Sequence, residues 1–245
     1  MASVIPRAIR RLVKSQRDNL RAALRSRPQS KADYDARFQM SLREWLIHHQ
    51  QDVIFDKCSW MGVRAIKNPL DAWVYQEIIF EVKPDVIVEI GSYEGGGTLF
   101  LAHLLELMGK GTVISIDIDR SRYAVQHDRI IAITGDSASD EVLEQVARLC
   151  EGKSVLALHD GDHSRTQVLR DLEAYSKFVS VNSYLIVEDG IVDLFDPRDG
   201  LGLPHDGPLA AVEEFLKKNP HFVVDPDRER YILTYSPRGF LRRIE

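Results

Sequence analysis

An α/β fold with a doubly wound, mostly parallel seven-stranded sheet is predicted by three features of the sequence. From residue 85 onward, short apolar segments alternate with longer segments of helical periodicity. Several short segments, such as 86–88 and 184–187, are continuously apolar, as expected for strands covered on both faces. The last two strand-like segments follow each other without a helix, joined by residues 226–228, and therefore predict an antiparallel terminal hairpin.

The expected elements follow one another along the chain. Helices are expected at 42–47 and 72–82, with loops at 60–63 and 68–71 between them. The expected strands are 85–90, 112–116, 130–134, 154–158, 183–187, 222–225 and 231–235. The helices expected between them are 97–109, 138–150, 165–178 and 208–218. In such open sheets the ligand site lies at the carboxyl ends of the strands.

The N-terminal arm is basic, whereas the rest of the chain is acidic. We expect this basic arm over 1–31, a helical extension over 32–82 and the α/β domain over 83–245. The arm has nine arginines or lysines and one acid, Asp18, and its apolar residues recur at helical spacing over 5–26. Three interpretations stay open: the arm packs on the body or on a neighbouring subunit of a homo-oligomer, lies on an anionic membrane surface, or is mobile or binds nucleic acid. The acidic body argues against nucleic acid as the main partner.

The sequence offers no signal for export or for membrane insertion. It has no run of eighteen apolar residues, and the basic N-terminus lacks the apolar stretch and cleavage site of a secretory signal. Cys58 and Cys150 match no metal or redox spacing, which is typical of a reducing compartment. We therefore expect a cytoplasmic protein, with peripheral contact at the inner face of the membrane as the alternative suggested by the arm.

A glycine-rich turn follows the first strand and predicts a nucleoside cofactor. The turn has the spacing E-x-G-x-x-x-G. A dinucleotide fingerprint requires G-x-G-x-x-G, and Tyr93 stands where its second glycine would be. The turn is similar to the methyltransferase loop that wraps the methionine part of S-adenosylmethionine. An acid after the second strand, Asp117, can accept hydrogen bonds from ribose hydroxyls. An ordinary tight turn is the alternative. The candidate cofactor residues are Glu89, Gly91, Ser92, Tyr93, Gly95, Asp117, Asp136 and Ser137.

Acids after the fourth and fifth strands predict a divalent metal. Asp160, Glu188 and Asp189 follow neighbouring strands, and clustered carboxylates repel one another unless a cation neutralises them. Oxygen ligands suit Mg²⁺ or Mn²⁺. Asp162 is a further candidate as a ligand, as a partner of a ligand or as a helix cap.

An acid–base residue stands beside the predicted metal. His163 lies three residues after Asp160, at the start of the next helix, where it can take a proton from an alcohol activated by the metal. The alternative is an ordinary polar histidine at a helix start. We name His163 and Asp160 as the catalytic candidates. Residues 190–207 form a long loop beside them, and His205 and Asp206 in this loop are candidates to contact the substrate.

Several motifs together resemble the cephalosporin hydroxylase family, a group of S-adenosylmethionine-dependent O-methyltransferase-like proteins that includes rhamnosyl O-methyltransferases. The resemblance spans residues 40–240. The motifs are Trp60-Met61-Gly62, Lys67-Asn68-Pro69-Leu70-Asp71, Trp73, Tyr75-Gln76-Glu77, Glu89-Ile90-Gly91 and Glu188-Asp189-Gly190. The resemblance implies a class I methyltransferase fold, a metal site at Asp160, Glu188 and Asp189, and a cofactor site at Glu89, Gly91 and Asp117. The more distant catechol O-methyltransferases have a catalytic lysine where this chain has His163, and Asp-Asn where it has Glu188-Asp189, so the resemblance leaves the base open.

The sequence therefore predicts a metal-dependent O-methyltransferase that uses S-adenosylmethionine and Mg²⁺ or Mn²⁺. Its expected acceptor is a hydroxyl of a sugar, such as a deoxysugar of a polysaccharide or glycolipid, or of a natural product. Two alternatives stay open: a non-catalytic partner protein that binds S-adenosylmethionine, and an oxidase or hydroxylase component of a biosynthetic complex. Turnover would separate the enzyme from the partner protein.

Overall fold

The computed structural model describes residue 28, residues 30–199 and residues 201–245. The chain divides into two compact units, Met1–Val53 and Ile54–Glu245. The basic helix predicted over 5–26 lies outside the described residues, and the domain boundaries predicted at 31 and 82 stay predictions.

The described residues of the first unit include two short helices with matching starts. α2 spans Lys31–Phe38 and α3 spans Leu42–His48. Ser30 and Ser41 each form a capping box with an acid three residues on, which satisfies backbone N–H groups that the first helical turn leaves free. A π-helical turn, η1, follows at His49–Ile54.

The second unit contains a seven-stranded sheet in the order β5-β4-β3-β6-β7-β9-β8. The first five strands of the chain in this sheet are parallel, whereas β9 is antiparallel to both β7 and β8. This arrangement confirms the predicted fold class. The strands are β3 (Val86–Ile90), β4 (Thr112–Asp117), β5 (Ile130–Thr134), β6 (Val155–His159), β7 (Tyr184–Val187), β8 (Phe222–Val224) and β9 (Phe240–Arg243).

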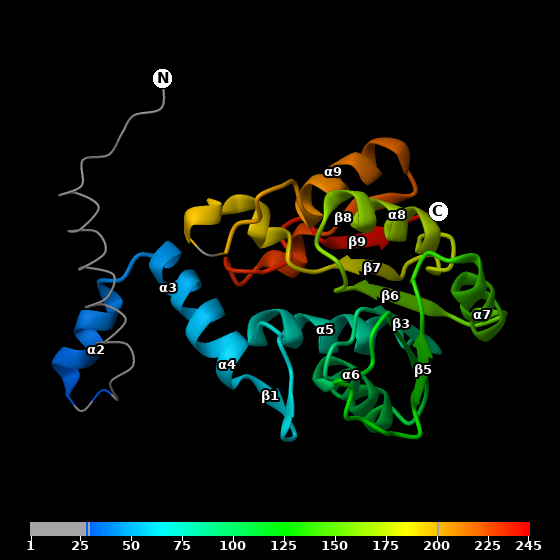
Figure 1. Ribbon diagram of the computed structural model, residues 1–245, viewed down its shortest axis with the longest axis horizontal. Coiled ribbons are helices and arrows are strands. Elements are labelled where there is room, and N and C mark those ends of the chain that lie inside the picture. Colours follow the sequence, from blue (N-terminus) through cyan, green and yellow to red (C-terminus); the bar gives the residue numbers. More distant parts are fainter. Residues whose placement is uncertain (1–27, 29, 200) are drawn as a thin grey trace. The chain divides into compact units, whose positions relative to one another are not determined.

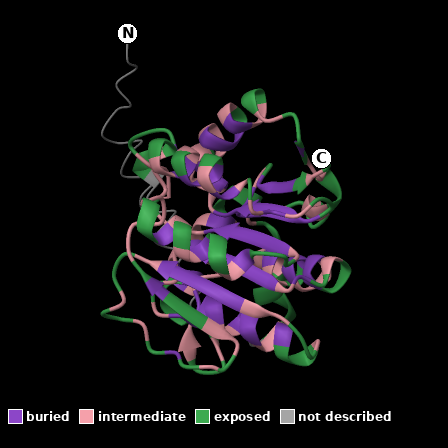
Figure 2. Ribbon diagram, turned by 90° about the vertical axis from the view of Figure 1, so that its right-hand side faces the viewer, coloured by how far each residue is buried: buried purple, intermediate pink, exposed green. Residues whose placement is uncertain are grey.

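Helices cover both faces of the sheet (Figure 1). α5 (Pro69–Val82) and α6 (Gly96–Leu107) pack against one face, which includes Ile87. α7 (Asp140–Cys150), α8 (Arg165–Tyr175) and α9 (Pro208–Lys218) pack against the other, which includes Val86 and Val88. Successive residues of β3 therefore enter opposite cores, which explains why residues 86–88 are continuously apolar. Figure 2 shows that the central strands are buried along their length.

The terminal hairpin predicted from the sequence is wrong in its second strand. Residues 231–235 form no strand, and the last strand is β9, with the 3₁₀ helix η4 (Pro226–Glu229) in the long connection before it. The physical reason is a competing partner: the Tyr235 N–H donates to the Asp71 carboxylate at 2.8 Å instead of to a neighbouring strand. Ile232 is 82% exposed with a φ of 70°, which also interrupts an extended strand.

The loop predicted at 60–63 contains a small hairpin instead. β1 (Ser59–Trp60) and β2 (Val63–Arg64) pair around Met61 and Gly62, both at positive φ, after the short helix α4 (Phe55–Lys57). The 190–207 loop contains two 3₁₀ helices, η2 (Gly190–Leu194) and η3 (Pro197–Asp199). Among the described residues, no helix is both long and apolar enough to cross a membrane.

Candidate active site

The parallel register places the chemically important residues in one row. Ile90 pairs with Ile116 of β4 on one side and with His159 of β6 on the other, and His159 pairs with Val187 of β7. The residue that follows each of these four strand positions therefore lies at the same edge of the sheet. In spatial order these residues are Asp117, Gly91, Asp160 and Glu188.

A cavity of about 570 Å³ opens along this edge. Gly91 makes the close approach of two strand ends possible: its φ is +86°, and a Cβ there would lie 2.2 Å from the Asp160 carbonyl oxygen. Six of the eight predicted cofactor residues line this cavity, namely Gly91, Ser92, Tyr93, Asp117, Asp136 and Ser137.

Asp117 organises the glycine-rich turn. Its Oδ2 accepts hydrogen bonds from the Ser92 and Tyr93 N–H groups at 2.8 and 2.9 Å, and its Oδ1 accepts from the Asp119 N–H at 3.0 Å. Burial raises the pKa of Asp117, but these donors outweigh it and hold the pKa below its usual range. An anionic carboxylate therefore shapes the cavity wall where a ribose was predicted to bind.

Glu89 and Gly95 lie outside that lining. Glu89 is 1% exposed, accepts from the Thr98 hydroxyl, and borders a smaller cavity of about 40 Å³ that also touches Lys67. Burial raises the pKa of Glu89 to about 7, against the opposing charge of Lys67. Gly95 is the N-cap residue of α6. A direct contact of either residue with the cofactor stays a prediction.

Two further predicted cofactor residues, Asp136 and Ser137, are both held by α8. The Ser137 hydroxyl donates to Asp171 Oδ1 at 2.6 Å, and Arg170 Nη1 donates to Asp136 Oδ2 at 3.0 Å. Asp171 lines the cavity and also contacts His159 Nε2 at 3.0 Å. Helix α8 therefore fixes the position of this cavity wall.

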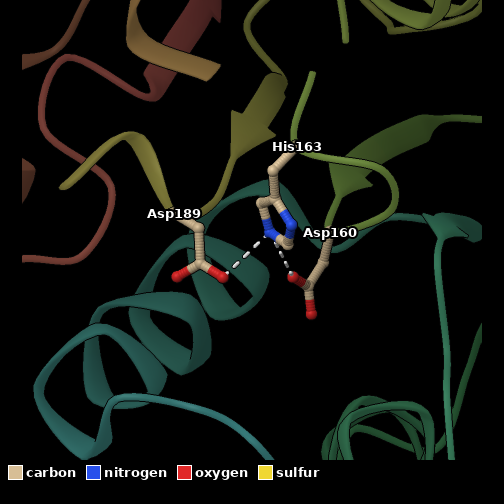
Figure 3. A group of neighbouring side chains, drawn as sticks. All are labelled: Asp160, His163 and Asp189. Carbon is tan, nitrogen blue, oxygen red and sulfur yellow. Dashed lines mark hydrogen bonds and ion pairs between the residues drawn. The ribbon is translucent and has the colours of Figure 1, made fainter. Parts of the chain in front are cut away.

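Asp160, His163 and Asp189 converge beside the cavity (Figure 3). His163 Nε2 lies 3.0 Å from Asp189 Oδ2 and 3.9 Å from Asp160 Oδ1. One possible ligand atom from each residue lies within 4.8 Å of the others, which is close enough for one cation. Asp189 has a φ of 58°, a left-handed conformation at the turn into η2, and its side chain points toward His163. Asp162 instead accepts from the Ser164 N–H at 2.6 Å, ahead of α8, and lines the cavity.

His163 is expected to be a cation in the metal-free protein. Burial alone would lower its pKa, but the hydrogen bond and charge of Asp189, together with Asp160 and Asp162, raise the pKa to about 9. Replacing Asp189 by asparagine removes the largest favourable contribution and is expected to move the pKa back toward its usual 6.5. An imidazole NMR titration of the metal-free protein checks both values, and a wild-type midpoint near 6.5 would contradict the ion pair.

Lys67 lies in one of the motifs of the resemblance, but no role at the site was predicted for it. Its ammonium donates to Asp160 Oδ2 at 2.5 Å and to Glu188 Oε1 at 2.7 Å, and its side chain is 10% exposed. Burial lowers the pKa of Lys67, but attraction to Asp160, Glu188 and Glu89 outweighs burial and raises it. Burial raises the pKa of the Asp160 and Glu188 carboxyls, and Lys67 opposes that shift. The partners of Lys67 are 93 and 121 residues away, so no local pattern indicates them.

Buried hydrogen bonds connect the start of α5 to the backbone at Tyr235. Asp71 accepts from the Tyr235 N–H at 2.8 Å and from Asn68 Nδ2 at 2.9 Å, and burial raises the pKa of Asp71 to about 6. The Ile191 N–H in turn donates to the Tyr235 carbonyl at 3.0 Å. These bonds anchor the start of the loop that follows Asp189.

The loop after Asp189 borders a second cavity, of about 430 Å³, formed with α9. His205 and Asp206, the predicted substrate contacts, line it together with Asp193. The Arg165 N–H donates to the Asp206 carbonyl at 3.0 Å, so this loop is tied to the start of α8, close to His163. The contact of His205 and Asp206 with a substrate stays a prediction.

The chain is similar to known proteins over most of its length. A family model described as Rhamnosyl O-methyltransferase/CmcI matches residues 52–244. A rhamnosyl O-methyltransferase of Mycobacterium leprae is 32% identical over 200 residues, covering 78% of this chain and 85% of that protein. One from Mycobacterium bovis is 28% identical over 202 residues, covering 78% and 80%.

Solved structures of CmcI share the fold. A form with magnesium and S-adenosylmethionine has a TM-score of 0.62 at 23% identity, covering 90% of this chain and 88% of that one. An apo form has a TM-score of 0.60 at 24% identity, covering 90% and 87%. At this identity the two structures establish the fold alone.

Proposed function

The chain belongs to the Rhamnosyl O-methyltransferase/CmcI family and is an S-adenosylmethionine-dependent O-methyltransferase, and we propose that it methylates a sugar hydroxyl with the help of a divalent metal ion. This membership confirms the resemblance to the cephalosporin hydroxylase family that the motifs predicted. The observation that carries the proposal is the position of Asp160, which lines the cofactor cavity and also belongs to the Asp160–His163–Asp189 cluster. The cofactor and the metal would therefore meet at one residue.

The donor set fits Mg²⁺ or Mn²⁺. The Asp160 and Asp189 carboxylates lie on either side of His163. A third carboxylate, Glu188, follows β7, the strand that pairs with the strand before Asp160. Hard cations prefer such oxygen ligands, and we propose Asp160, Glu188 and Asp189 as the residues that would hold the ion. When bound, the ion would polarise an acceptor hydroxyl and lower the pKa of that hydroxyl.

The protein's own groups account for the remaining steps. Asp117 and the turn at Ser92 and Tyr93 would hold the nucleoside part of the cofactor at the cavity wall. His163 Nε2 points into the cluster, where it would take the proton that the acceptor hydroxyl loses as it attacks the methyl group. This step requires neutral His163, so the proton that Nε2 holds in the metal-free protein must first be released to solvent.

A sugar acceptor is supported by three arguments. The Mycobacterium relatives are named for rhamnosyl groups, and vicinal hydroxyls of a sugar chelate a metal well. The second cavity adds polar groups that can bind hydroxyls, because Asp193, His205, Asp206 and Glu213 line it. Assembly into a homo-oligomer, a cytoplasmic location and contact of the basic arm with a membrane stay predictions.

Calorimetry with S-adenosylmethionine and with Mg²⁺ tests the proposal. Asp117→Ala is expected to weaken cofactor binding at least about tenfold, since hydrogen bonds to a charged group contribute about 1.5–3 kcal/mol. The double variant Glu188→Ala/Asp189→Ala is expected to lose the heat of Mg²⁺ binding. Asp128→Ala, at an exposed acid before β5, is the matched control.

Three results bear directly on the proposal. Formation of S-adenosylhomocysteine with a rhamnoside acceptor would support the sugar substrate and exclude a non-catalytic partner protein. Wild-type protein that binds neither ligand would contradict the proposal. Cofactor binding unchanged in Asp117→Ala would contradict the assignment of the cavity.

A further inference from the structure

Lys67 reaches the active site along a path that the fold keeps open for it. It lies in the segment between β2 and α5, and its side chain passes over the first turn of α6. A Cβ at Gly97, in that turn, would lie 2.8 Å from Lys67 Cε, so a larger residue there would displace the lysine stem. The same turn borders the small cavity that Lys67 lines with Asp160.

The ammonium group uses one oxygen from each of two acids. Lys67 Nζ contacts Asp160 Oδ2 at 2.5 Å and Glu188 Oε1 at 2.7 Å. The other Asp160 oxygen, Oδ1, faces His163 Nε2 at 3.9 Å and so points to the cluster with Asp189. The two oxygens of Asp160 are thus divided between a fixed ion pair and the proposed metal site.

Burial makes this ion pair a fixed element of the site. The side chains of Lys67 and Glu188 are 10% and 7% exposed, so neither has free access to water. A carboxylate with one oxygen held in this way can rotate little, and its second oxygen keeps one direction. Removing a group that orients metal ligands in this way commonly lowers the affinity for the metal.

We propose that Lys67 is the positioning residue of the metal site: by holding Asp160 Oδ2 and Glu188 Oε1, it leaves Asp160 Oδ1 directed toward the cluster with His163 and Asp189. This inference rests on the proposed function and goes beyond it, because Lys67 itself is not a ligand. It also keeps the acids together in the metal-free protein, where they would otherwise repel one another.

Electrostatics alone predicts the opposite effect of losing Lys67. Removing a positive charge beside a cation site would strengthen binding of a divalent ion, because like charges repel. Loss of ligand orientation weakens binding instead. The sign of the change in metal affinity therefore decides whether Lys67 positions the ligands or merely neutralises them.

The experiment measures Mn²⁺ binding by electron paramagnetic resonance of the free ion. The full-length variants are Lys67→Met, which keeps the length of the stem without its charge, and Lys67→Arg, which keeps the charge. Lys110→Met is the control, since Lys110 pairs with Asp85 at 2.8 Å on the exposed surface. Lys67→Ala is measured with and without ethylammonium, which can replace the missing amine. Circular dichroism reports folding for each variant.

We expect the Mn²⁺ dissociation constant of Lys67→Met to rise about 10- to 100-fold, as for other residues that orient ligands. Lys67→Arg should recover most of the affinity, Lys110→Met should match the wild type, and ethylammonium should restore binding in Lys67→Ala. Folded Lys67→Met that binds Mn²⁺ as tightly as the wild type, or more tightly, would overturn the inference alone. If Lys67→Met does not fold, the absence of any gain from ethylammonium in Lys67→Ala overturns it. A wild type that binds no Mn²⁺ overturns both the inference and the metal-dependent function.

Discussion

Replacing Asp189 by asparagine is expected to lower metal-dependent methyl transfer at least about 100-fold, because the change removes a charged ligand and the anion that orients His163. The Asp189 carboxylate contacts His163 Nε2 at 3.0 Å and shares the cluster with Asp160. An amide of the same shape keeps an oxygen in place but has no net charge to hold a divalent cation. The measurement is the rate of S-adenosylhomocysteine formation with the best rhamnoside acceptor of the wild type, at saturating Mg²⁺.

Two comparisons make this result specific. Chelation of divalent ions by EDTA should reduce the wild type to the level of Asp189→Asn, and Mg²⁺ should restore the wild type but not the variant. Asp128→Asn, at an exposed acid remote from the row of strand ends, should keep wild-type turnover and its Mg²⁺ dependence. Equal activity of Asp189→Asn and the wild type at low Mg²⁺ would remove Asp189 from the metal site.

The row of residues at the sheet edge was predictable because two local signals combine with one rule of topology. Asp117 ends β4, Glu188 directly follows the apolar strand β7, and Asp160 directly follows the buried strand β6. Parallel strands joined by helices bring their carboxyl ends to one edge. The register then sets these residues side by side, as the pairing of Ile90 with Ile116 and His159 shows.

Features that depend on distant partners could not be predicted in this way. Lys67 carries no local sign of its role, because its two acids lie 93 and 121 residues further along the chain, after β6 and β7. The segment 231–235 has strand-like composition, but Asp71 takes the Tyr235 N–H, and the true edge strand is Phe240–Arg243. Glu89 is the first residue of the glycine-rich motif, yet it is buried, accepts from Thr98, and borders the small cavity instead of the large one.

Replacing His163 by glutamine is expected to lower kcat about 10²- to 10⁴-fold, the usual contribution of a general base. Glutamine can still donate a hydrogen bond to Asp189 but cannot take a proton from an alcohol. Cofactor affinity should change little, because His163 does not line the large cavity. Steady-state kinetics and calorimetry with S-adenosylmethionine measure the two quantities, and His221→Gln, at an exposed histidine, is the control.

Metal affinity in the same variant separates the two roles open to His163. Its Nε2 lies within the group of atoms that could hold one cation, so the geometry alone allows a ligand as well as a base. A base that is not a ligand predicts a large fall in kcat with Mn²⁺ affinity unchanged, whereas a ligand predicts that both fall together and that excess Mn²⁺ restores turnover. We expect the first result, because Asp160, Glu188 and Asp189 already supply a set of oxygen ligands that suits a hard cation. Restoration of His163→Gln by excess Mn²⁺ would instead make His163 a metal ligand and leave another group to accept the proton.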